Sequence, residues 1–159
     1  MGISKEKGVL RFTAGLATVN HVVADSEQVD NVVEVPVVTL NELLENQEPL
    51  LIKIDVEGFE ANVIAGADKV FSKLSLLAVI MELNGSGERY GFDEYPLHEK
   101  MLSFGFRSYS YSPFERQLVS LNGKKSNSGN TLYVRNIDEV IYRLKGAQQY
   151  WIANVAKNV

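Results

Sequence analysis

Acidic side chains follow two short apolar segments of the sequence, Leu50–Ile54 and Leu76–Met81. Runs of this length and composition are typical of strands that are covered on both faces. The polar residues that come directly after them are Asp55, Glu57, Glu82 and Asn84. In an open α/β sheet, ligands lie beyond the carboxyl ends of the strands. If the two strands are neighbours, these side chains meet in one crevice at one edge of the sheet.

Such a group of side chains can perform two kinds of chemistry. Carboxylates can remove the proton of a hydroxyl group or orient that group, and carboxylate and amide oxygens can also hold a hard cation. The residues have a structural explanation as well. Glu57 can cap the helix that follows, Glu60 favours the positive end of that helix, and Asp55 can accept backbone amides at a tight turn. The sequence alone leaves both interpretations open.

Two histidines complete the set of candidate polar residues. His21 lies in a loop, where a histidine has more functional potential. His98 lies in a predicted amphipathic helix, and we expect it at the surface. The two are too far apart in sequence to suggest metal ligands, and the sequence contains no cysteine. We therefore assign no metal site.

The elements that must position these residues alternate along the chain. Strands are predicted over 8–13, 32–38, 50–54, 76–81, 106–111, 117–121 and 131–134. Helices are predicted after Thr39, after Gly58, after Asp93 and over 137–157. Alternation followed by a terminal strand pair predicts an α/β sheet, parallel with antiparallel strands at one side.

Composition narrows the classes of function. The chain has 159 residues, of which 45% are hydrophobic, so it is long enough for one domain with a core. Its formal net charge of −4 argues against a nucleic-acid partner. No signal peptide and no apolar run long enough for a bilayer are visible, so we expect a soluble, cytoplasmic protein with no membrane partner. No glycine-rich strand-to-helix turn of the dinucleotide-binding kind occurs.

Six segments of the sequence together resemble the FkbM family of methyltransferases. They are Val37–Leu44, Leu51–Glu60, Gly66–Ala67, Ile80–Asn84, Gly105–Phe106 and Asn130–Val134. The most specific is the core Lys53-Ile54-Asp55-Val56-Glu57-Gly58. The similarity extends from about Gly8 to Arg135, so we treat residues 1–159 as a single, partial domain of this kind. One departure is Asn41, where the family usually has aspartate.

The resemblance implies a Rossmann-like class I methyltransferase sheet, mostly parallel, with an antiparallel C-terminal hairpin. It implies S-adenosylmethionine as cofactor and O-methylation of a small hydroxylated molecule, such as a sugar or a polyketide. We assign Asp55, Glu57 and Glu82 as catalytic residues. His21 and Asn84 are assigned to binding the acceptor.

In this family the fold begins with a strand, a glycine-rich turn and an acidic residue that bind the cofactor. The present sequence resembles the part downstream of them, so we expect weak S-adenosylmethionine binding. A non-catalytic α/β module that associates without cofactor is the alternative function. The strand at 50–54 would lose its family neighbour and become an edge, which predicts a homodimer. The early strands, 9–13 and 32–38, folding back onto that edge are the alternative cover.

Overall fold

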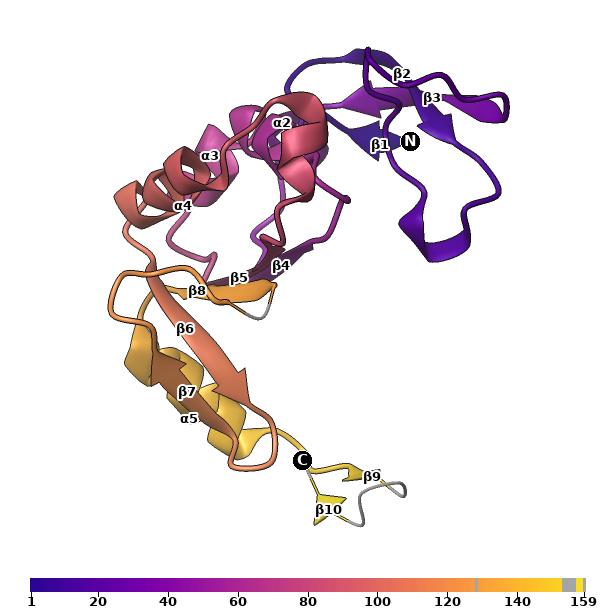
Figure 1. Ribbon diagram of the computed structural model, residues 1–159. Coiled ribbons are helices and arrows are strands. Elements are labelled where there is room, and N and C mark those ends of the chain that lie inside the picture. The colour runs from indigo at the N-terminus through magenta and orange to yellow at the C-terminus, as the bar shows by residue number, and fades with distance from the viewer. Residues whose placement is uncertain (128, 153–156, 159) are drawn as a thin grey trace.

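A five-stranded mixed sheet is the largest element of the computed structural model, which describes residues 1–127, 129–152 and 157–158 (Figure 1). Its order is β4-β5-β8-β6-β7, with β4 Leu51–Ile54, β5 Ala78–Glu82, β6 Arg107–Ser112, β7 Gln117–Ser120 and β8 Asn130–Val134. The predicted α/β class and these five strands are confirmed, with ends shifted by one or two residues.

The prediction of a mostly parallel sheet is wrong. β4 and β5 are parallel, but β8 is antiparallel to both of its neighbours, β5 and β6, and β7 is antiparallel to β6. β5 and β6 are consecutive in this part of the chain but are not neighbours in the sheet. β8 lies between them and runs antiparallel to both. β4, β5 and β6 therefore point the same way, and the antiparallel β6–β7 hairpin is present as predicted.

Short helices surround the sheet. They are α1 Leu40–Leu43, α2 Glu60–Ala65, α3 Asp68–Ser72, α4 Glu94–Ser103 and α5 Ile137–Gly146, with 3-10 turns η1 Ala17–Val19 and η2 Ser86–Tyr90. Thr39 and Glu42 form the predicted capping box at α1. The Asn41 side chain accepts the backbone N–H groups of Lys69 and Val70, at 3.0 and 3.1 Å, at the start of α3. Asparagine thus supplies the acceptor oxygen that an aspartate would offer there.

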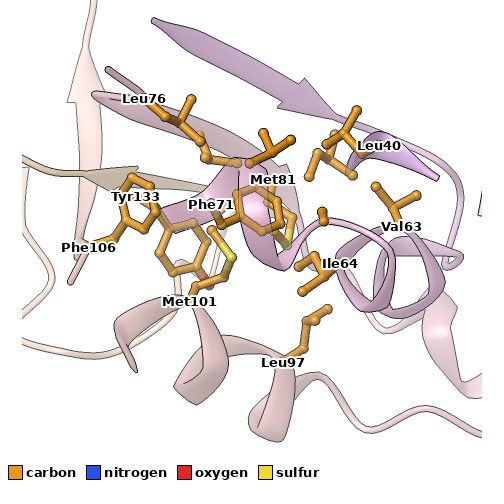
Figure 2. Close-up of a cluster of buried hydrophobic side chains, with 14 of the residues drawn as sticks. Leu40, Val63, Ile64, Phe71, Leu76, Met81, Leu97, Met101, Phe106 and Tyr133 are labelled. Carbon is orange, nitrogen blue, oxygen red and sulfur yellow. The ribbon is translucent and has the colours of Figure 1, made fainter. Parts of the chain in front are cut away.

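Both faces of the sheet carry a hydrophobic layer, because neighbouring residues of a strand point to opposite faces. Met81 and Tyr133 belong to the larger cluster, together with side chains of α2, α3 and α4 (Figure 2). Ala78 and Val134 belong to a smaller cluster with α5. The larger cluster fixes β4 and β5, whose carboxyl ends carry the acidic residues. None of the helices in the described residues could cross a bilayer.

A second, smaller sheet lies at the N-terminal end of the molecule (Figure 1). β3 (Val32–Val38) pairs in parallel with β1 (Gly2–Ile3) and antiparallel with β2 (Gly8–Thr13). Gly66, between α2 and α3, lies so close to this segment that a Cβ atom there would be 2.5 Å from the Ser4 carbonyl oxygen. This contact packs the small sheet against the helices that cover the main sheet.

The end of the chain differs from the predicted helix over 137–157. α5 ends at Gly146, and β9 (Trp151–Ile152) pairs antiparallel with β10 (Lys157–Asn158). The guanidinium group of Arg116 donates to the carbonyl oxygens of Leu144 and Ala147. These carbonyls lie where the helix stops, so an external donor replaces the next helical turn. Residues 153–156 of the predicted helix lie outside the described residues.

β4 occupies the edge of the main sheet. Within the residues that the structure describes, no strand pairs with its second edge, and β2 and β3 form their own sheet instead of covering it. Leu50 and Leu51 beside this edge are 47% and 55% exposed. They line an apolar groove of about 560 Å³ together with Leu132 of β8. A free edge next to exposed leucines is typical of a strand that recruits another strand.

We propose that a second copy of the chain covers this edge in a two-fold dimer, as the sequence predicted. Leu51→Asp places a charge in the contact and should give a monomer by light scattering at tens of micromolar. Leu74→Asp, at a position that is 83% exposed and does not line the groove, is the matched control and should remain dimeric. A wild-type monomer whose mass does not change with concentration would contradict the dimer.

Candidate active site

Asp55 and Glu82 lie side by side at the carboxyl ends of the two parallel strands. The register pairs Ile54 with Met81, so the residues that follow them, Asp55 and Glu82, are at the same level. On its other side, Glu82 lies opposite Asn130 of β8. The Asp55 and Glu82 carboxyl groups are close enough to share a hydrogen bond. The structure therefore brings together the two acids that the sequence placed at strand ends.

The surroundings shift the pKa values of the two carboxyl groups in opposite directions. Lys53, two residues earlier on the same face of β4, forms an ion pair with Asp55 and holds the pKa of Asp55 below its ordinary value. Burial raises the pKa of Glu82, and the charges of Asp55 and Glu57 raise it further. Two neighbouring carboxylates with separated pKa values are typical of a site in which one acts as acid or base.

Glu57 reaches the same site from a tight turn. Its φ is +54° and that of Gly58 is +99°, both in the left-handed region. The Phe59 N–H donates to the Val56 carbonyl oxygen at 3.2 Å, which closes the turn. Any Cβ atom at residue 58 would lie 2.3 Å from the Ser86 carbonyl oxygen, so this position requires glycine. The turn leaves the Glu57 side chain partly buried and near Glu82.

Asn84 lies two residues beyond Glu82, at the start of the loop that leads to η2. Its Oδ1 atom accepts the backbone N–H of Ser86 at 3.0 Å. Its side chain also hydrogen-bonds to Glu82, which opposes the upward shift of the pKa of Glu82. The structure therefore joins Asn84 to the acidic residues, as the sequence predicted, and its role in binding the acceptor stays a prediction.

His21 lies apart from the acids, in the loop after β2. Its Nδ1 atom is 2.9 Å from the Val19 carbonyl oxygen, and its Nε2 atom is 3.2 Å from Oε1 of Glu27. The side chain is 8% exposed. Both ring nitrogens thus have partners within the protein, and the structure does not bring His21 into contact with Glu82. Its predicted role in binding the acceptor is untested.

His98 is buried, so the prediction of a surface position is wrong. The side chain is 2% exposed, and its Nε2 atom lies 2.9 Å from the Gly123 carbonyl oxygen while Nδ1 lies 2.8 Å from the Tyr133 hydroxyl. A carbonyl oxygen only accepts, so Nε2 carries the proton and Nδ1 accepts from Tyr133. The side of α4 that carries His98 faces β8 and the turn before it, which a helical pattern alone does not reveal.

Sequence analysis missed three residues that shape the site: Lys53, Glu60 and Arg89. Lys53 could have been found, because residues two apart on a strand share a face. Glu60 is 4% exposed, and its Oε1 atom accepts the N–H groups of Val56 and Gly58. Burial raises its pKa. Arg89 had no local signal, because its partners come from distant segments of the chain.

In the described part of the chain, no group of three or more histidine, cysteine, aspartate or glutamate side chains is arranged to hold a metal ion. The carboxyl groups of Asp55 and Glu82 already interact with each other and with Lys53 and Asn84. Carboxyl groups arranged in this way are able to transfer protons.

Comparison with protein families identifies the kind of domain that carries this site. Residues 5–113 match the methyltransferase FkbM domain. The chain belongs to the FkbM methyltransferase family. The matched segment includes all five residues assigned from the sequence, and it ends within the turn after β6. No curated protein and no solved structure matches the chain.

The raised pKa of Glu82 predicts a measurable effect on stability. Folding disfavours the ionised form of Glu82. The contribution of this residue to the free energy of unfolding therefore falls as pH rises through its folded-state pKa. Glu82→Gln should therefore increase the free energy of unfolding at about pH 7, and less so at about pH 3, where the carboxyl group is protonated in both states. Chemical denaturation at the two pH values measures the difference.

Glu99→Gln, on the exposed side of α4, is the matched control and should change stability little at either pH. A Glu82→Gln effect of the same size at both pH values would contradict a raised pKa, because a packing change does not depend on the protonation of this carboxyl group.

Proposed function

We propose that this chain is an S-adenosylmethionine-dependent O-methyltransferase for a small hydroxylated molecule of the sugar or polyketide type. The observation that carries the proposal is the Asp55–Glu82 pair at the ends of two parallel strands, in a chain of a methyltransferase family. We also propose that β4, β5 and β6 belong to a Rossmann-like sheet. A cytoplasmic location remains a prediction from the sequence.

Glu82 is the residue best suited to take the proton of the acceptor hydroxyl. O-Methylation forms an O–CH₃ bond and breaks an S–CH₃ bond, and the hydroxyl proton must go to a base. A carboxyl group with a raised pKa is a stronger base than an ordinary one, and general bases of this kind contribute to rate when they lie within hydrogen-bond reach. Asn84 can hold the acceptor oxygen beside Glu82.

The acidic edge also fits the charge of the cofactor. S-Adenosylmethionine supplies an electrophilic methyl group on a positively charged sulfur. Asp55, kept ionised by Lys53, and Glu57 place negative charge at this edge, which favours a cation. Asp55 and Glu57 are therefore the residues of this chain that we expect nearest the sulfonium group, while Glu82 and Asn84 face the acceptor.

Methyl transfer to a panel of sugars and hydroxylated polyketides tests the proposal. With labelled S-adenosylmethionine, the wild type should transfer methyl groups, and Glu82→Gln should lower kcat/KM by roughly 100-fold, as expected for loss of a general base. Glu99→Gln should retain wild-type rates. Equal rates for wild type and Glu82→Gln would contradict the role of Glu82.

The rival function is a non-catalytic α/β module, and cofactor binding distinguishes it from the enzyme. We expect S-adenosylmethionine to bind with a dissociation constant weaker than about 1 μM, equivalent to −8.2 kcal/mol, because the contacts that we assign to it come from the strand-end residues Asp55 and Glu57 alone. Titration calorimetry measures this value. Tighter binding would show that other residues have formed the cofactor site. No binding and no methyl transfer at millimolar cofactor would instead favour the non-catalytic module.

A further inference from the structure

The turn that carries Glu57 has a backbone conformation that is unfavourable for a glutamate residue. Glu57 and Gly58 both have positive φ, and the φ values of the two are those of a type I′ turn. Glycine tolerates this region, but a side chain at the first position introduces strain. Such a conformation persists where the surroundings hold it in place. The contacts around the turn therefore decide where the Glu57 carboxylate lies relative to Glu82.

Arg89 holds this turn from outside. Its Nη1 atom donates to the Glu57 carbonyl oxygen at 3.4 Å. Its Nε atom lies 3.4 Å from Oε1 of Glu27. Arg89 belongs to η2, whose backbone at Ser86 packs against Gly58. One guanidinium group thus joins η2, the Glu57 turn and the loop after β2.

Glu27 and His21 hold Arg89 in turn. Oε2 of Glu27 accepts the Ala24 backbone N–H at 2.8 Å, while Oε1 forms an ion pair with Arg89 and lies 3.2 Å from Nε2 of His21. The His21 ring lies between this carboxylate and the Val19 carbonyl oxygen. Both partners only accept hydrogen bonds, so both bonds form together only when both ring nitrogens carry protons.

We propose that His21, Glu27 and Arg89 form a positioning relay that holds the Glu57 turn beside Glu82, so that His21 acts through Arg89 and not on the acceptor. The effect on methyl transfer rests on the proposed function, but the effect on the turn does not. Three segments of chain, residues 19–27, 56–60 and 86–90, are linked by these side chains. The relay replaces the role in acceptor binding that the sequence suggested for His21.

The test is amide hydrogen exchange of Gly58 and Phe59, combined with an NMR titration of the Glu82 carboxyl group. Arg89→Met should speed exchange at both amides by about tenfold and lower the pKa of Glu82, because the Glu57 charge moves away. Arg89→Lys keeps the charge and should restore part of the protection. His21→Phe keeps a ring but removes both donors, and should produce the Arg89→Met effect in weaker form.

Arg107→Met is the matched control. Arg107 is exposed and is the first residue of β6, at the end of the sheet away from the acidic site, so this substitution should leave both the amide exchange and the Glu82 titration unchanged. Wild-type exchange and titration in Arg89→Met would overturn the relay, as would the same changes in Arg107→Met. If Arg89→Met changes the amide exchange and the Glu82 titration but His21→Phe changes neither, His21 is not part of the relay. Since neither readout needs methyl transfer, the relay can fail or stand independently of the enzyme activity.

Discussion

The parallel register of β4 and β5 is the constraint on which the rest of the site depends. It places two carboxyl groups at the same level, and like charges at that distance repel. Ile54 and Met81, one residue earlier on each strand, are 4% and 0% exposed. A shift of one residue would turn these side chains out of the core, so burial fixes the register and with it the acidic pair.

Two neighbours of the pair reduce this repulsion. Lys53 stabilises the charge on Asp55, and Asn84 offers a hydrogen bond to Glu82. The turn at Glu57 adds a third carboxylate. The backbone N–H groups of Val56 and Gly58, which belong to this turn, donate to the Glu60 carboxylate. A protein that needed stability alone would gain from neutral residues at these positions. Groups of residues that lower the stability of the fold in this way are typical of functional sites.

The acidic residues and the α/β class could be predicted from the sequence because both depend on local patterns: apolar runs of strand length, followed by charge. The position of β8 could not, since the residues of β8 form a strand equally well at an edge or in the middle of a sheet. His98 was misplaced because a helical pattern does not reveal which later segment packs beside it. The bonds between Arg89 and its partners were invisible, since they join three loops that are adjacent only after folding.

The central place of β8 has a consequence for how the molecule is made. β6 joins the sheet through β8, and β8 also forms the second neighbour of Glu82. β8 comprises residues 130–134, so it lies beyond the segment that matches the family, residues 5–113. During synthesis on the ribosome, β4 and β5 are made before β8, and one side of β5 stays unpaired until residues 83–129 have followed. The wall of the acidic site that Asn130 forms opposite Glu82 is thus added only after both strands that carry the acids have been translated.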